Sequence, residues 1–326
     1  MGLVSCRPGS PMRTIFLGTP SFAVPTLERM IAAGHSVELV VTQPDRPKGR
    51  GNSIAMPPVK EAALRHGLEV FQPARIRRPE GVERLRAIGP EIMVIVGYGQ
   101  IIPQSILDIA PRGMLNVHAS LLPKYRGAAP IQWAIANGES ITGVTIMRID
   151  AGLDTGDMLR KCQTPVGENE TAIELSPRLA EMGADLLVET LATLDSIMAE
   201  KQDGDAATLA PILKKEDGVI DWTRPAREIH NRVRGLQPWP GAYSFFRGQA
   251  MHIWSSRVSE DRSPHPAGTL VLQHRQLYAT AGDGLFLELR EVQMEGRKRL
   301  PGDVFANGAR LMPHEKLGEI SGEAKN

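Results

Sequence analysis

Runs of apolar residues alternate with amphipathic segments through the first half of the chain. The apolar runs predict buried β-strands at residues 13–18, 37–42, 91–96, 114–117 and 143–149. Apolar side chains at helical spacing predict helices at residues 22–33, 59–66 and 130–136. Ser21 is placed to cap the first of these helices and Gly34 to end it. Strands that alternate with helices in this way predict an α/β domain with a Rossmann-like, mostly parallel sheet.

The pattern changes in the second half of the chain. Residues 168–201 are typical of one long helix, and a polar connector follows at residues 202–214. Beyond it, short β-type runs between Gly, Pro and Asp turns predict a small antiparallel, OB-like barrel with strands at 242–246, 251–258, 268–272, 277–279 and 285–292. We therefore predict a disordered leader at 1–11, with Met12 as the functional start, a first domain at 12–201, a linker at 202–214 and a β-barrel domain at 215–326.

The composition excludes several classes of protein. With 38 Lys and Arg against 37 Asp and Glu, the overall charge indicates no particular partner. Two cysteines, Cys6 and Cys162, are too few for a disulfide framework and are typical of a reducing, cytoplasmic location. The histidines lack the spacing of zinc motifs, so we expect no metal. No apolar run reaches the roughly 20 residues of a membrane span, so we expect no membrane partner.

The turn after the first strand argues against two common nucleotide-binding functions. From Gly18 it has the sequence Gly-Thr-Pro-Ser-Phe-Ala, whereas a dinucleotide-binding turn needs the glycines of G-x-G-x-x-G for backbone approach to the pyrophosphate. A P-loop motif is absent from the sequence as well. A nicotinamide-dependent dehydrogenase is therefore not expected.

Two polar clusters occur where predicted strands end. Asn116 and His118 are two residues apart, so they share one face of a buried strand just before a loop rich in Pro and Gly. Residues 150–157 combine three carboxylates with two glycines, which allow close backbone approach to a ligand. Ligands in open α/β sheets bind at such strand ends. Each cluster alone is also compatible with a structural role: a satisfied strand-end histidine in the first case, and a surface turn in the second.

The 154–156 segment, Asp-Thr-Gly, is also similar to an aspartic-protease motif. That chemistry needs two carboxylates that share a proton, and the sequence holds no second copy of the motif. We therefore reject this interpretation.

From Met12 onward the chain contains a series of short sequence motifs that match one protein family. The matching segments occur in one order and are Phe16-Leu-Gly-Thr-Pro20, Thr42-Gln-Pro-Asp-Arg-Pro47, Gly49-Arg-Gly51, Gln72-Pro73, Tyr98-Gly99, Ile102-Pro103, Asn116-Val-His118, Ser120-Leu-Leu-Pro123, Arg126-Gly-Ala-Ala-Pro-Ile-Gln132, Thr142-Gly-Val-Thr-Ile-Met147, Gly152-Leu-Asp-Thr-Gly-Asp-Met158, Ile220-Asp-Trp222 and Pro238-Trp-Pro240. Any one of these matches would be weak, but together they are specific. From Met12 onward the chain therefore resembles the methionyl-tRNA formyltransferases.

The resemblance implies an activity and a set of site residues. Such enzymes transfer the formyl group of 10-formyltetrahydrofolate, a cosubstrate, to the α-amine of methionine on initiator tRNA. The residues that match their catalytic set are Asn116, His118 and Asp154. The tetrahydrofolate site would be lined by Ser120, Leu121, Leu122 and Pro123, and the pterin would meet the backbone of Val96, Gly97 and Tyr98. The resemblance also implies the formyltransferase fold and a monomer.

The 44–51 loop is the first candidate tRNA contact, because it sets three cations among prolines and glycines. In the family this loop meets the acceptor end of the tRNA, so Arg50 is the preferred contact and Lys48 the second. We expect Arg46 to be structural, paired with Asp45 or with a backbone carbonyl.

The C-terminal barrel is a second candidate. The cations that could contact phosphates there are Lys214, Lys215, Arg232, Arg234, Arg247 and Arg297 to Arg299. The aromatic residues Trp222, Trp239, Tyr243, Phe245 and Phe246 are expected to pack in the core and turns.

Alternatives to this interpretation remain open. A sugar-nucleotide formyltransferase would use the same three catalytic residues and formyl donor on an aminosugar. Related hydrolases release formate to water, and glycinamide-ribonucleotide transformylases lack the barrel. A non-enzymatic RNA-binding protein would use the barrel alone and leave the polar strand-end cluster without a role.

Overall fold

The structure, a computed structural model, describes residues 11–48 and 53–318. Contacts between Cα atoms divide the chain into two compact units: residues 1–127, 142–164 and 176–209 form the first, and residues 128–141, 165–175 and 210–326 form the second. Apart from Pro11, the predicted leader lies outside the described residues. The predicted limits of the linker, 202 and 214, stay a prediction.

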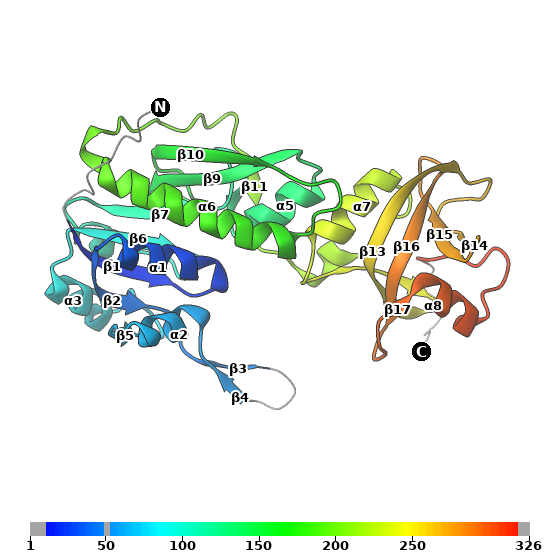
Figure 1. The fold of residues 1–326 in the computed structure, drawn as a ribbon, viewed down its shortest axis with the longest axis horizontal. Coiled ribbons are helices and arrows are strands. Elements are labelled where there is room, and N and C mark those ends of the chain that lie inside the picture. The colour runs from blue at the N-terminus through cyan, green and yellow to red at the C-terminus, as the bar shows by residue number, and fades with distance from the viewer. Residues whose placement is uncertain (1–10, 49–52, 319–326) are drawn as a thin grey trace, which may run out of the picture. The chain divides into compact units, whose positions relative to one another are not determined.

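The first unit is built on a seven-stranded sheet, ordered β10-β9-β7-β6-β1-β2-β5 (Figure 1). Its strands are β1 (Arg13–Gly18), β2 (Ser36–Val41), β5 (Val70–Phe71), β6 (Ile92–Val96), β7 (Met114–His118), β9 (Ile141–Arg148) and β10 (Met158–Pro165). The pairs from β5 through β2, β1 and β6 to β7 are parallel. β9 runs antiparallel to β7, so the helix between them is not the parallel crossover that the alternating pattern predicted.

Helices cover the two faces of this sheet. They are α1 (Val24–Ala32), α2 (Pro58–Arg65), α3 (Pro79–Ile88), α4 (Gln104–Leu107) and α6 (Ala172–Ala192), with 3-10 turns η1 (Ser21–Ala23) and η2 (Leu194–Ser196). Apolar residues of α3 and α4 join one face of β1, β2, β6 and β7 in a single buried cluster. α6 covers the other face, because a Cβ on its Gly183 would lie 2.6 Å from Cγ1 of Val117.

Two helix boundaries differ from the prediction. Ser21 does not cap the first helix: it begins η1, and neither η1 nor α1 has a side-chain cap. The predicted 168–201 helix is shorter, because Thr171 and Glu174 form reciprocal hydrogen bonds of 2.8 and 3.3 Å that start α6. The sequence contains this capping box, but the prediction followed the apolar spacing and began the helix too early, at residue 168.

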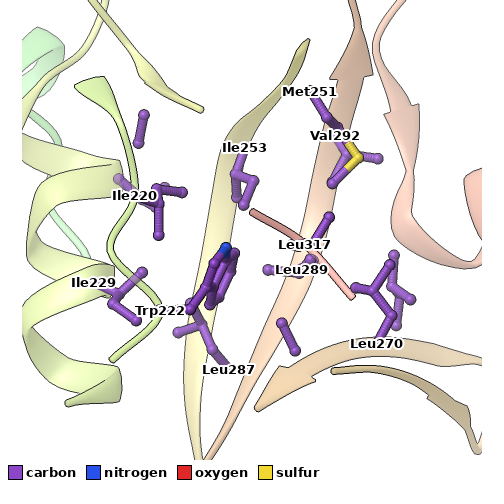
Figure 2. Close-up of a cluster of buried hydrophobic side chains, with 14 of the residues drawn as sticks. Ile220, Trp222, Ile229, Met251, Ile253, Leu270, Leu287, Leu289, Val292 and Leu317 are labelled. Carbon is purple, nitrogen blue, oxygen red and sulfur yellow. The ribbon is translucent and has the colours of Figure 1, made fainter. Parts of the chain in front are cut away.

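The second unit contains an antiparallel sheet with its own core. Its strands are β12 (Ala242–Phe246), β13 (Gln249–Arg262), β14 (Leu270–Gln273), β15 (Gln276–Thr280), β16 (Leu285–Met294) and β17 (Leu300–Pro301), and its helices are α5 (Pro130–Ala136), α7 (Ala226–Gly235) and α8 (Gly302–Ala309), with the turn η3 (Lys215–Gly218). Figure 2 shows the buried core, in which Trp222 lies among aliphatic side chains of β13, β16 and α7.

The strand order β12-β13-β16-β15-β14 leaves two edges, and a later segment hydrogen bonds to both. Leu270 N and Leu317 N donate to the carbonyls of Glu315 and Gly268 beside β14, and Gly318 N donates to Phe245 of β12. The predicted fold class, a mostly parallel sheet followed by an antiparallel β domain, is confirmed.

Helix α7 packs against α5 and β13 with a polar buried face. His230 is 3% exposed, and its ring nitrogens lie 3.0 Å from Ser256 Oγ and 3.4 Å from the carbonyl of Glu168. Arg234 is 6% exposed and donates to Asn231 Oδ1 and to the carbonyls of Gly167 and Glu170. This helix therefore fixes the 165–175 segment through buried hydrogen bonds.

Candidate active site

Strand β7 places Asn116 and His118 on the sheet face opposite α6, because side chains alternate along a strand and Val117 faces that helix. Asn116 pairs with Ile95 of β6 and His118 pairs with Thr145 of β9. The imidazole is 5% exposed. The sequence predicted that these two residues share a face, and the structure confirms it.

Asp154 lies beside Asn116 and His118, although the strand pattern did not predict that its loop would approach β7. Because β9 is antiparallel to β7, its last residue, Arg148, pairs with Leu115 near the start of β7. The loop that follows must fold back along β7. The Asp154 carboxylate then lies 3.4 Å from Asn116 Nδ2 and 3.7 Å from His118 Nδ1, and it accepts a 2.9 Å hydrogen bond from the backbone N–H of Gly127.

The hydrogen bonds of His118 define its tautomer. Its Nε2 lies 2.9 Å from the carbonyl oxygen of Tyr125. A carbonyl only accepts, so Nε2 carries the hydrogen and the Nδ1 of a neutral ring carries a lone pair. That lone pair faces Asp154 Oδ2, which is also an acceptor. Two acceptor atoms, His118 Nδ1 and Asp154 Oδ2, therefore face each other at 3.7 Å.

Two residues of the site adopt left-handed backbone conformations that are unusual outside glycine. The φ angles of Tyr125 and Asp154 are 61° and 51°. Asp tolerates this region better than Tyr, but each costs of order 1–2 kcal/mol. Gly156 follows at a point where a Cβ would lie 2.0 Å from the carbonyl oxygen of Arg148. Such strain persists where surrounding contacts hold it, which is typical of functional sites.

The predicted folate residues at 120–123 lie in the loop after β7. Ser120 is fully buried, and its hydroxyl donates to the carbonyl of Lys124 at 2.6 Å. Thr145, opposite His118, donates to the carbonyl of Ser120 and accepts from the N–H of Leu122. Leu122 is buried, while Leu121 and Pro123 are half-buried. Sequence reasoning missed Thr145 as the anchor of this loop, because only the antiparallel register brings it there.

The other predicted folate segment, Val96 to Tyr98, ends β6. Val96 is buried, Gly97 is exposed with a φ of 57°, and Tyr98 is 1% exposed within the core cluster under α3 and α4. Burial raises the pKa of the Tyr98 hydroxyl. The carbonyl of Tyr98 accepts from Thr19 Oγ1 at 3.0 Å and from Gln43 Nε2 at 3.1 Å. The backbone at Gly97 is thus the exposed part of this segment.

The predicted tRNA loop forms a short hairpin of β3 (Arg46–Lys48) and β4 (Ser53–Ala55). Lys48 ends β3, and Arg50 lies outside the described residues. Asp45 does not pair with Arg46 as expected: its carboxylate accepts 2.7 Å hydrogen bonds from Lys60 Nζ and Gln72 Nε2, which lower the pKa of Asp45.

The C-terminal cations that the sequence analysis named divide into two groups. Arg234 is buried, Arg232 donates to the carbonyl of Asp217, and Arg247 forms a two-point ion pair with Glu315 at 2.6 and 3.0 Å. The second group is exposed and comprises Lys214, Lys215, Arg297, Lys298 and Arg299. Of the aromatic residues, Trp222, Tyr243 and Phe246 are buried as expected, whereas Trp239 is 54% exposed.

Within residues 11–48 and 53–318, no helix combines the length and apolarity needed to cross a membrane. In the same part of the chain, His, Cys, Asp and Glu side chains form no group of three that could hold a metal ion.

Solved structures share this fold. A sugar 3N-formyl transferase, crystallised with dTDP and 5-N-formyl-THF, superposes with a TM-score of 0.67 over 89% of this chain and 100% of that one, at 19% identity. An N-formyltransferase from Helicobacter canadensis, in complex with folinic acid and dTDP-3-aminofucose, gives a TM-score of 0.66 over 86% and 98%, also at 19% identity. At this identity the likeness shows the fold alone.

Sequence relatives are much more similar. Two family models match: formyl transferase over residues 12–191, and formyl transferase, C-terminal domain, over residues 212–310. The methionyl-tRNA formyltransferase of Solibacter usitatus is 64% identical over 94% of this chain and 99% of its own length, and that of Koribacter versatilis is 55% identical over 95% and 100%. The chain therefore belongs to the methionyl-tRNA formyltransferase family of enzymes, as the resemblance of its motifs predicted.

Proposed function

We propose that this enzyme transfers the formyl group of 10-formyltetrahydrofolate to the α-amine of initiator methionyl-tRNA, with Asn116, His118 and Asp154 as its catalytic residues. The observation that carries the proposal is the convergence of an amide and an imidazole from β7 on the carboxylate of Asp154, which lies 3.4 Å from Asn116 Nδ2 and 3.7 Å from His118 Nδ1. The curated relatives are named for this substrate, and their identity extends through both units.

In this reaction the departure of the folate nitrogen is more difficult than the activation of the attacking amine. A free α-amine has a pKa of about 7.7–8.0, so an appreciable fraction is unprotonated near neutral pH. Its attack on the formyl carbon places negative charge on the formyl oxygen. The amide of Asn116 has two N–H donors, and one of them faces Asp154, so the other can donate to that oxygen. A donor of this kind contributes about 2.7–4 kcal/mol to transition-state stabilisation in a comparable site.

His118 moves the proton. Its Nδ1 lone pair takes the proton that the attacking nitrogen loses, and Asp154, 3.7 Å away, stabilises the imidazolium. The same Nδ1 then returns the proton to the weakly basic folate nitrogen as the bond between that nitrogen and the formyl carbon breaks. Positioned acid–base groups contribute roughly 10²–10⁴-fold to such reactions. The division of labour between His118 and Asp154 is part of this proposal.

The substrate contacts follow the matched motifs. The 120–123 loop would line the folate site, and the exposed backbone at Gly97 fits a ring that needs close main-chain approach. Arg50 is the first candidate for a contact with the tRNA, and Lys48 is the second. In the second unit the exposed Lys215, Arg297 and Lys298 are better candidates for phosphate contacts than the buried Arg234. We also propose a cytoplasmic monomer that uses no metal.

Two alternatives give different products in one assay. Labelled formyl transfer is measured with methionyl-tRNA and, separately, with an aminosugar nucleotide as acceptor. We expect formylated methionyl-tRNA and no labelled sugar. Labelled sugar would support a sugar-nucleotide formyltransferase instead, and binding of tRNA without transfer to either acceptor would support the RNA-binding alternative.

A further inference from the structure

We propose that Gln202 and Thr208 are positioning residues for this reaction, and that residues 200–208, here called the brace, hold both catalytic loops in their working conformation. The inference rests on the proposed function of Asn116, His118 and Asp154. The sequence pattern assigned these residues to the helix end and linker, with no role in the site.

The side chain of Gln202 joins the two loops directly. Its Nε2 donates to the carbonyls of Asp154 and Gly156 at 2.8 and 2.7 Å. Its Oε1 accepts from Arg126 Nε at 2.9 Å. One partly buried amide therefore uses both its donor and acceptor ends to tie the 150–157 loop to the 125–127 segment.

The bonds of Gln202 extend a backbone pairing. Glu200 and Met158 exchange two N–H···O bonds, both of 2.8 Å. Gly156 and Asp154 precede Met158 by two and four residues. Their carbonyls are therefore the acceptors that a continued pairing would reach next. Gln202 supplies side-chain donors where the backbone pairing ends, so the brace follows the catalytic loop up to Asp154.

Thr208 holds the second loop. Its Oγ1 accepts from Tyr125 N at 2.9 Å, and its carbonyl accepts from Arg126 N at 2.8 Å. Thr208 N also approaches the carbonyl of Pro123, at 3.4 Å. The two ends of the brace thus contact the two loops that surround His118.

Gln202 and Thr208 contact the two site residues that have left-handed backbone conformations, Asp154 and Tyr125. Asp154 is held through its carbonyl by Gln202, and Tyr125 through its N–H by Thr208. Asp154 supplies the carboxylate that faces His118 Nδ1, and Tyr125 supplies the carbonyl that accepts from Nε2. Each nitrogen of the imidazole therefore meets a group whose disfavoured backbone conformation depends on the brace.

The test separates positioning from mere stabilisation. Gln202→Leu keeps the size of the side chain and removes its hydrogen bonds, and Thr208→Val does the same for the hydroxyl. We expect kcat to fall by up to about 10²-fold, the effect of a small misplacement of catalytic groups, with KM for both substrates near the wild-type values. Thr208→Ser should restore most of the loss. The matched control is Gln104→Leu. Gln104 begins α4, is exposed and donates a hydrogen bond to Asp108, so its replacement should leave kcat unchanged.

A pH profile adds a second readout. In Gln202→Glu an ionised carboxylate faces two carbonyls, whereas the protonated carboxyl group can donate to one of them. The kcat of this variant relative to that of Gln202→Leu should therefore rise as the pH is lowered. A ratio that stays constant with pH would contradict the role of the Gln202 donors.

The third readout does not depend on activity. The ¹⁵N signals of the His118 ring in the folded protein should shift in Gln202→Leu and Thr208→Val, and not in Gln104→Leu. Unchanged ring signals and kcat, with only a lower melting temperature, would overturn the inference. A wild-type enzyme that transfers no formyl group to methionyl-tRNA, while the ring signals still respond to the brace, would instead overturn the proposed function.

Discussion

His118 and His230 are both buried, one in each unit, and their surroundings differ at a single ring nitrogen. Each ring directs Nε2 at a backbone carbonyl, of Tyr125 and of Glu168 respectively. The Nδ1 of His230 faces a hydroxyl, that of Ser256, which can donate to its lone pair. The Nδ1 of His118 faces the carboxylate of Asp154, which cannot.

The difference separates a histidine with structural partners from the histidine that we propose to be catalytic. The neutral ring of His230 has a complete set of partners, and burial lowers its pKa, so the neutral form is the stable one. The ring of His118 instead has the acceptor oxygen of a carboxylate 3.7 Å from its Nδ1. Burial alone therefore does not identify a functional histidine. The group that faces Nδ1 is what distinguishes the two rings.

Replacing His118 should have the largest effect on activity. In His118→Asn the Nδ1 that carries the proton is lost, and we expect kcat for formyl transfer to fall by roughly 10²–10⁴-fold. The free energy of unfolding should fall by only about 1–3 kcal/mol, from the carbonyl of Tyr125 that loses its donor. Steady-state kinetics and urea denaturation of the same preparation measure both quantities. A variant with nearly full kcat would remove His118 from the mechanism.

Replacing His230 should have a similar effect on stability and little on catalysis. His230→Leu leaves Ser256 Oγ and the carbonyl of Glu168 without their partner, so the free energy of unfolding should fall by about 1–3 kcal/mol. Urea denaturation measures this change, and kcat of the folded variant should remain near the wild-type value. A large loss of kcat without loss of stability would show that the two histidines do not differ as described.

The pH dependence of stability gives the smallest effect. The pKa of His230 is lowered in the folded state, so the unfolded chain binds a proton first as the pH falls below the ordinary value of about 6.5. The contribution of His230 is therefore fully present above about pH 6.5 and is lost as the pH falls toward the folded pKa. The pKa values of the buried His35 and the half-buried His252 are lowered as well, so both act in the same direction. The melting temperature of His230→Leu should fall less than that of the wild type over this range, and an equal fall would contradict the assignment.

The same contrast explains what the sequence could predict. β1 and β12 were predicted with their observed bounds, because both are short runs rich in β-branched or aromatic residues between turns. Helix α7 was missed because His230, Asn231 and Arg234 lie on its buried face, so its core side looks polar in the sequence. β10 was missed because Arg160 and Lys161 interrupt its apolar pattern at the edge of the sheet.

The candidate site residues could be named from the sequence, through the resemblance of their motifs, but their geometry could not. Asn116 and His118 follow from the two-residue period of a strand. The approach of Asp154 depends on the antiparallel direction of β9, which hydrophobic periodicity does not encode. The contacts of Gly127, Thr145 and Gln202 depend on the same folding back of separate segments.

The most direct test of the account is the single-turnover rate of formyl transfer by Asn116→Ala, with both substrates saturating and methionyl-tRNA as acceptor. Loss of the amide that donates to the developing oxyanion should slow this step by about 10²–10³-fold. A single-turnover rate equal to that of the wild type would contradict the central claim that the cluster at the end of β7 carries out the chemistry.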